Sequence, residues 1–182
     1  PRFFARFPEI TIDISFSDEA VDLIAEGYDI AVRTGNITDS RLTTRLLTRG
    51  PQITFAAPAY LARHGEPTKP QDLRQHNCIV GRFGPEWSFR DPSGRPMKLR
   101  VSGNTVINSG DALREAAVAG LGIAQGTWWL VRKDLESGAL KSLLTDWIPE
   151  GNPVSVLYPQ QRHLPAKLRT FLDFLVEITR TG

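Results

Sequence analysis

The chain has 182 residues, and its 22 Lys and Arg residues nearly balance its 20 Asp and Glu residues, so the formal net charge is only +2. A hydrophobic content of 41% and a charged content of 23% are ordinary for a globular protein. No basic run or stripe marks a nucleic-acid surface, and no apolar run approaches membrane-spanning length. The single cysteine, Cys78, excludes an internal disulfide and fits a reducing compartment.

The start of the chain predicts a strand, a helix and a second strand. Residues 1–8 look like the end of a helix, which suggests that the chain is a fragment. Residues 9–16 alternate polar and apolar side chains, as a strand does. Ser17 is a plausible N-cap of a helix that ends near Gly27, and residues 29–33 form the next strand. Such a unit is expected to cross over into a parallel sheet.

The middle of the chain predicts short elements separated by turns. A polar loop at residues 34–39 follows the second strand. Proline near the first position and glycine at the exit favour a short helix at residues 58–65. The other expected elements are extended segments at 41–48 and 52–57, a short helix at 70–74, a strand at 78–80, and antiparallel strands at 87–89 and 97–101 around a turn at 91–94.

Residues 107–124 are the most informative segment. They predict a helix between Ser109 and Gly120 and a strand at 123–124. Asn108 or Ser109 can accept the free N–H groups of the first helical turn. A helix start at a strand end is a place where open α/β sheets bind ligands, although an ordinary capped helix has the same pattern.

The last third of the chain predicts two more helices and two more extended segments. Trp128 and Trp129 begin the first helix about 100° apart, so we expect one in the core and the other near a cleft or interface. The expected elements are a helix at 127–135, an extended segment at 139–144, a strand at 153–159 and a final helix from Pro165 with a continuous apolar face.

Two α/β halves follow from this order, with strands near 78–81 and 153–158 as the crossings between them. A chain that passes twice between two lobes makes a hinged cleft, which is a common location for a ligand site.

Several kinds of catalytic or metal site lack support. None of the three histidines has a partner at metal-ligand spacing, so zinc is not expected. There is no G-x-S-x-G elbow and no Walker lysine loop. Residues 120–126 imitate a dinucleotide fingerprint, but the spacing is off by one and the segment leaves a helix instead of entering one. Cys78 is expected to be a small buried apolar residue. We expect no enzyme activity, no metal and no cofactor.

Six short segments together carry a resemblance to a known family. In this order and spacing, the chain resembles the effector-binding domain of LysR-type transcriptional regulators over essentially all of its length. The segments are residues 7–10, 27–33, 57–61, 119–124, 135–140 and 165–175.

The resemblance implies a periplasmic-binding-protein-like fold of type II, with two Rossmann-like α/β lobes joined by two crossover strands. The first lobe would hold residues 1–78 plus 155–182, and the second residues 79–154. A strand and a helix of the first lobe would precede Pro1, as would a winged helix-turn-helix that binds DNA. The implied partners are a small-molecule effector, a homodimer of this domain and a homotetramer of the full regulator, in the cytoplasm and without a membrane. The helix at 112–119 is a candidate interface element.

The resemblance also implies which residues line the cleft. Helix starts at Ser17 and Ser109 could hold an anion such as a carboxylate, and Arg33 could pair with it. Arg33 could equally form a salt bridge, Ser17 a simple cap, and Gln125 a solvated loop contact. The expected effector residues are Phe16, Ser17, Arg33, Thr34 and Gly35 from the first lobe, and Thr105, Asn108, Ser109, Gln125, Gly126 and Thr127 from the second.

Two other classes of protein remain open at this point. A solute-binding receptor of a transporter would share the fold and the cleft, but it would need an export signal upstream. A small enzyme would need a catalytic constellation that these residues do not supply.

Overall fold

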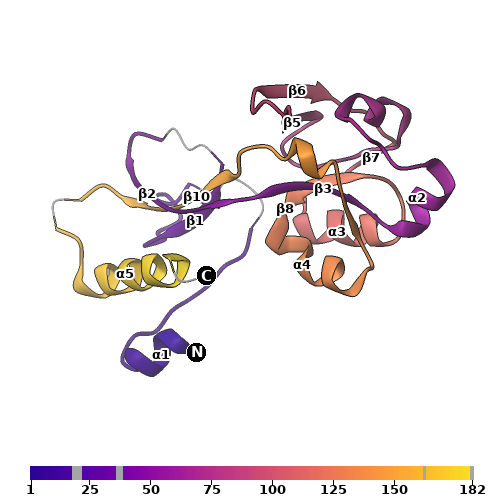
Figure 1. Cartoon of the computed structure of the whole chain (residues 1–182). Coiled ribbons are helices and arrows are strands. Elements are labelled where there is room, and N and C mark those ends of the chain that lie inside the picture. Colours follow the sequence, from indigo (N-terminus) through magenta and orange to yellow (C-terminus); the bar gives the residue numbers. More distant parts are fainter. Residues whose placement is uncertain (18–21, 36–38, 162, 181–182) are drawn as a thin grey trace. The chain divides into compact units, whose positions relative to one another are not determined.

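A computed structural model describes residues 1–17, 22–35, 39–161 and 163–180, and Figure 1 shows its helices and strands. The chain divides into two units. The first holds Pro1–Arg49 and Asn152–Gly182, and the second is the continuous segment Gly50–Gly151.

The boundaries of these units differ from those expected. Residues 50–78 belong to the second unit because strand β3 (Gln52–Ala56) pairs with β8 (Ala124–Thr127) and β9 (Lys141–Leu143). The chain therefore passes between the units after Arg49 and after Gly151, not near residues 78–81.

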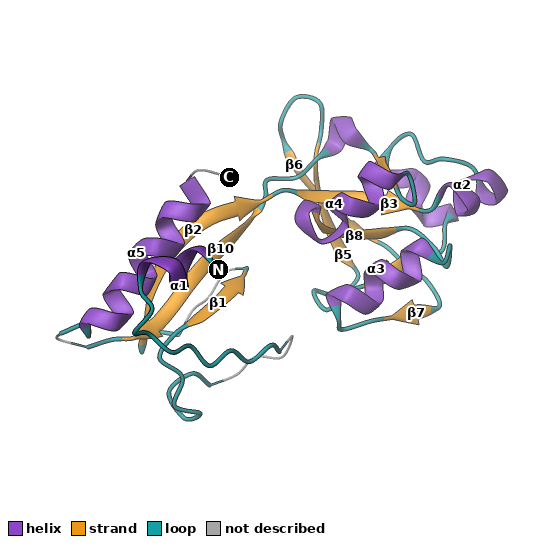
Figure 2. Ribbon diagram, turned by 90° about the horizontal axis from the view of Figure 1, so that it is seen from below, coloured by secondary structure: helices purple, strands orange, loops and turns teal. Residues whose placement is uncertain are grey.

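The first unit has one helix lying along a three-stranded sheet. The strands β1 (Ala31–Thr34), β10 (Asn152–Pro159) and β2 (Leu42–Gly50) lie in the order β1-β10-β2. Helix α5 (Ala166–Arg180) packs Leu168 and Leu172 on Val156 of the central strand. The short helix α1 (Arg2–Arg6) lies beside α5 (Figure 2). Its Phe3 ring is 5.0 Å from the ring of Phe171 and 5.1 Å from that of Phe174.

Two predictions for this unit are wrong. Residues 9–16 form no strand, and in the described residues no ladder pairs with them. A strand needs a hydrogen-bonded neighbour, and Phe16 is instead 94% exposed. In the described residues, β1 also lacks the expected parallel partner at 9–16 and pairs with β10 in antiparallel register instead, with Val32 opposite Val156.

The helix expected from Ser17 to Gly27 falls partly outside the described residues, which omit 18–21. From Asp22 the chain makes a turn, in which Asp22 Oδ1 accepts hydrogen bonds from the N–H groups of Ile24 and Ala25. Gly27 closes the turn with φ of 73°, a backbone conformation that glycine adopts readily.

The second unit contains most of the expected elements. Strand β3 is central between β8 and β9, β4 (Ile79–Val80) pairs in parallel with β7 (Thr105–Val106), and β5 (Glu86–Arg90) forms a hairpin with β6 (Pro96–Arg100). The helices are α2 (Pro58–His64), α3 (Gly110–Val118) and α4 (Trp128–Ser137), with 3-10 turns η1 (Pro70–Gln75) and η2 (Thr145–Trp147). The predictions of these helices and of the hairpin are confirmed.

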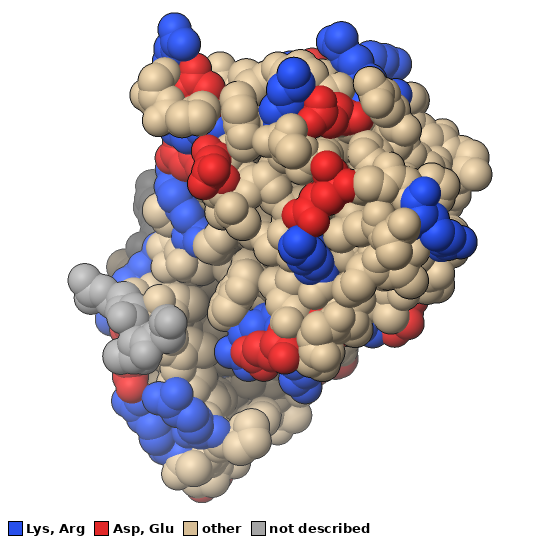
Figure 3. All heavy atoms as spheres, turned by 45° about the vertical axis from the view of Figure 1, so that its right-hand side comes forward, with Lys and Arg blue, Asp and Glu red and all other residues tan. Residues whose placement is uncertain are grey.

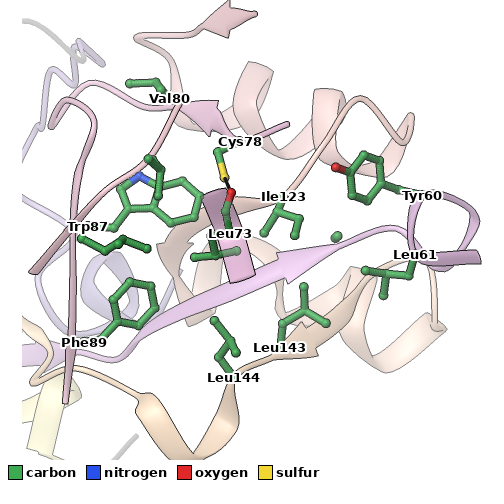
Figure 4. Close-up of a cluster of buried hydrophobic side chains, with 13 residues drawn as sticks. Tyr60, Leu61, Leu73, Cys78, Val80, Trp87, Phe89, Ile123, Leu143 and Leu144 are labelled. Carbon is green, nitrogen blue, oxygen red and sulfur yellow. Dashed lines mark hydrogen bonds between the residues drawn. The ribbon is translucent and has the colours of Figure 1, made fainter. Parts of the chain in front are cut away.

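Two buried clusters form the core of the second unit. In one of them, Trp87 and Phe89 of the hairpin pack with Leu73 and Cys78 (Figure 4). The Cys78 thiol is fully buried and donates to the Leu73 carbonyl at 3.6 Å, so its expected burial is confirmed. The second cluster lies where α3 and α4 meet the sheet, and its members include Phe55, Ile79, Leu113, Ala117 and Val131.

Local signals explain where α3 begins and ends. Ser109 is its N-cap, and the Ser109 hydroxyl accepts from the Ala112 N–H at 3.5 Å. Leu113 and Ala117 are the buried face, as the spacing predicts. Gly120 follows with φ of 75°, so the helix stops where a left-handed residue is available.

Candidate effector site

In the first unit, the expected site residues come from the end of β1 and from the segment that precedes residue 18. Arg33 Nη1 donates to the Ser17 carbonyl oxygen at 3.1 Å, so these two residues are in direct contact. Thr34 ends the strand. The Gly35 N–H donates to the Pro153 carbonyl at 2.8 Å with φ of 105°, which disfavours any side chain there. Phe16 precedes Ser17 and is exposed.

In the second unit, one group of expected residues lies where β7 leads into α3. Thr105 pairs with Ile79 in the parallel ladder, and its hydroxyl donates to Asn104 Oδ1 at 2.8 Å. The Ile107 N–H extends the same pairing to the Val80 carbonyl at 2.9 Å. Asn108 is exposed, and its side-chain amide makes no hydrogen bond to the described part of the chain. The amide of Asn108 is thus available beside the start of α3.

A second group lies on β8. Gln125 Nε2 donates to the Ser88 carbonyl at 3.1 Å and to Thr54 Oγ1 at 3.5 Å. Gln125 is therefore tied to β5 and β3 and is not a solvated loop residue. Thr127 is the N-cap residue of α4, but its side chain makes no capping hydrogen bond.

Leu130 connects these two groups. A Cβ atom at Gly110 would lie 3.6 Å from Leu130 Cδ2, and one at Gly126 would lie 3.8 Å from the same atom. The start of α3 and the end of β8 therefore both lie next to one leucine side chain. Within the second unit, residues 108–110 and 125–127 belong to one continuous region.

Three charged side chains of the first unit form ion pairs with one another. Arg41 bridges Asp39 and Asp22 at 2.7 and 3.1 Å. Hydrogen bonds from Arg41 lower the pKa of Asp39 to about 2, so this carboxylate stays ionised at neutral pH. Figure 3 shows blue and red side chains largely interspersed on the face it presents, with no broad surface of one sign. This face has no electrostatic footprint for DNA phosphates.

One supporting residue is Asn77, which the sequence did not single out. Asn77 Oδ1 accepts from the Asn104 N–H at 3.0 Å, and Nδ2 donates to the Leu121 carbonyl at 2.7 Å. It therefore ties together the turns that lead into β7 and towards β8. A single asparagine before a strand carries no pattern from which these two distant contacts could be predicted.

The described residues hold neither a cluster of metal-ligating side chains nor a membrane-spanning helix. No three His, Cys, Asp or Glu side chains gather in the described ranges to hold an ion. In the same ranges, no helix is both long and apolar enough to cross a bilayer.

Comparison with known proteins identifies the class. Residues 1–180 match the family described as the LysR substrate binding domain. The chain belongs to this family, which confirms the resemblance, the type II fold and the assignment as a regulator's effector domain.

Particular relatives agree with this assignment. The chain is 34% identical over 181 residues to the transcriptional regulator CrgA of Neisseria meningitidis, covering 97% of this chain and 60% of CrgA. It is 30% identical over 184 residues to the regulator YcaN of Escherichia coli, covering 95% of this chain and 58% of YcaN. The chain thus spans about three-fifths of the length of these relatives.

Solved structures show the same fold. The regulatory domain of CrgA matches 98% of this chain with a TM-score of 0.84 and 32% identity, and 88% of that domain is covered. The full-length Vibrio cholerae virulence activator AphB matches 98% of this chain with a TM-score of 0.83 and 29% identity, and 61% of it is covered. The relatives are transcriptional regulators, so the alternative of a transporter's solute receptor is wrong.

Proposed function

We propose that this domain senses a small, anionic metabolite through residues contributed by both units, and that binding alters an oligomer that controls transcription. The observation that carries this proposal is the continuous region in the second unit, where the free Asn108 amide, the capped start of α3 and the end of β8 meet. These groups can bind and orient a ligand, but they include no nucleophile or paired acid and base. The domain is therefore proposed to bind its effector without transforming it.

An anion is the favoured class of effector for two reasons. The first turn of a helix presents N–H groups that have no partner within the helix, and the helix dipole favours negative charge there. Arg33 supplies a guanidinium whose other nitrogen atoms can pair with a carboxylate. The expected effector residues of the first unit are proposed to contribute through Arg33 and Ser17, which are already in contact.

The proposed partners of the whole regulator follow from the family. DNA would bind through a helix-turn-helix outside this chain, in the cytoplasm, and this domain would pair as a homodimer within a tetramer. Helix α3 is the proposed interface element, because the exposed side of its small alanines permits close approach of another helix. Light scattering of the purified domain measures this association.

A metabolite panel tests the binding proposal. Thermal shift followed by calorimetry should find a carboxylate or phosphate compound that stabilises the domain. Asn108→Ala and Arg33→Ala should each weaken its binding about tenfold or more, since each removes hydrogen bonds to the ligand.

Matched controls are available for both variants. Gln71→Ala and Arg169→Ala remove an exposed amide and an exposed guanidinium elsewhere and should leave binding unchanged. The proposal fails if no compound binds the folded domain, or if the two site variants bind as tightly as the controls.

A further inference from the structure

The two places where the chain passes between its units meet at a pair of glycines. The chain enters the second unit at Gly50 and leaves it at Gly151. A Cβ atom at Gly151 would lie 2.6 Å from the Gly50 carbonyl oxygen and 3.1 Å from the Pro51 nitrogen. Backbone therefore packs directly on backbone here, and only glycine permits such an approach.

A tryptophan ring covers Gly50. A Cβ atom at Gly50 would meet the Trp129 ring at Cη2, and it would lie 2.8 Å from Cζ2 and 3.0 Å from Cζ3. Gly50 is buried by this contact, although Trp129 itself remains 45% exposed. The sequence led us to expect one of the two adjacent tryptophans in a core, but both are substantially exposed. The ring of Trp129 instead packs on Gly50, where the chain passes between the units.

The main chain at the start of α4 forms a hydrogen bond to the same crossing segment. The Trp128 N–H donates to the Pro51 carbonyl at 2.8 Å. Adjacent residues of α4 thus hold adjacent residues of the crossing, one by a main-chain hydrogen bond and the other by an aromatic ring. The Trp128 ring has a different role, since the Arg132 guanidinium lies 5.6 Å from its centroid.

We propose that Trp129 is a positioning residue whose indole, seated on Gly50, restrains the backbone where the chain crosses into the second unit. The crossing segments are the covalent connections through which one unit can turn relative to the other. Hinge motion is absorbed by a few backbone dihedrals at such connections. A ring packed on one of them limits those dihedrals, so Trp129 sets how freely the connection bends.

Hydrogen exchange of the whole chain tests the restraint. Trp129→Ala should speed exchange of the amides of Arg49, Gly50, Gln52 and Ile53 about tenfold, because the ring no longer opposes local opening. Trp128→Ala is the matched control, since it removes the neighbouring indole but keeps the main-chain hydrogen bond to Pro51. Equal exchange in the two variants would overturn the proposal.

A second measurement reports the mobility of the connection itself. Spin labels at Ala62→Cys in α2 and Arg169→Cys in α5 give a distance distribution between the units, while the native Cys78 is buried and unlabelled. The distribution should broaden in Trp129→Ala and stay unchanged in Trp128→Ala. An unchanged width in Trp129→Ala would contradict a positioning role even if that variant lost stability.

A double substitution guards against a variant that fails to fold. Gly50→Ala should lower Tm by several degrees, because its Cβ collides with the Trp129 ring. In the Trp129→Ala background the ring is absent, so Gly50→Ala should lower Tm much less. Additive effects of the two substitutions would show that the ring does not press on Gly50 and would overturn the proposal.

Discussion

The two units bury their apolar side chains to very different extents. The second unit has two buried clusters that include Phe55 and Phe89. Among the described residues, the first has a smaller cluster of Val156, Leu168 and Leu172 and a buried ring pair of Phe3 and Phe174, and it leaves Phe16 and several aliphatic side chains exposed. Because burial of apolar surface is the main favourable term in folding, the comparison indicates that most of the stability lies in the second unit.

Expression of the second unit alone tests this difference in stability most strongly. Residues 50–151 form a continuous segment with its own core and its own sheet. We expect it to fold and to unfold cooperatively when circular dichroism is followed with temperature. A fragment that remains unfolded at low temperature would show that the second unit depends on the first.

Two core substitutions in the whole chain compare the stability of the two units directly. Phe55 is fully buried in the second unit, so Phe55→Ala should cost about 3–5 kcal/mol of unfolding free energy. Leu172→Ala creates a similar cavity in the first unit, but we expect it to shift only an early, partial unfolding transition. Denaturant titrations followed by fluorescence and by far-UV circular dichroism distinguish a change in the main unfolding transition from a change in an earlier, partial one. A single transition moved equally by both variants would contradict the comparison.

Thiol labelling measures how often each unit opens. Burial raises the pKa of Cys78 to about 12, so at pH 8 its labelling by an alkylating reagent should be about a hundredfold or more slower than in the unfolded chain. A Val156→Cys variant places a thiol in the core of the first unit, and we expect that thiol to react faster than Cys78. Mass spectrometry of the labelled peptides measures both rates in one sample. Faster reaction of Cys78 would reverse the proposed order of stability.

The smallest expected effect is a pH dependence of stability that arises from His76 in the second unit. Burial, assisted by the nearby His64, lowers the pKa of His76 below its ordinary 6.5. As the pH falls through 6.5, the unfolded chain takes up this proton before the folded chain does. The free energy of unfolding therefore decreases on acidification and keeps its full value above that pH. His76→Gln should flatten the slope of Tm between pH 7 and pH 5. An unchanged slope would show that other groups cause the acid sensitivity.

What could be predicted from the sequence depends on whether an element is stabilised by residues near it in the sequence or by distant ones. Ser109, Gly120 and Gly138 carry local capping signals, so the limits of α3 and α4 were predictable. The hairpin around Asp91 was predictable as well, because Asp91 accepts hydrogen bonds from the N–H groups of Ser93 and Arg95 within its own turn. These elements depend on neighbours in the sequence.

The incorrect predictions depended on distant partners. Residues 9–16 have the alternation of a strand, but alternation does not supply the hydrogen-bonded neighbour that a strand requires. The unit boundary at Gly50 depends on the pairing of β3 with β8 and β9, whose paired residues are 69 or more positions away in the sequence. For the candidate site, the start of α3 was predictable from its cap, whereas the ties of Gln125 to Ser88 and of Asn77 to Asn104 were not.

The central proposal is that Arg33 and Ser17 of the first unit bind the effector together with residues of the second unit. Calorimetric titration of the compound found in the metabolite panel into the whole chain and into residues 50–151 tests this claim most directly. We expect binding to the whole chain and at least about tenfold weaker binding to the fragment, which lacks Arg33 and Ser17. Equal affinity for the whole chain and for the folded fragment would contradict it.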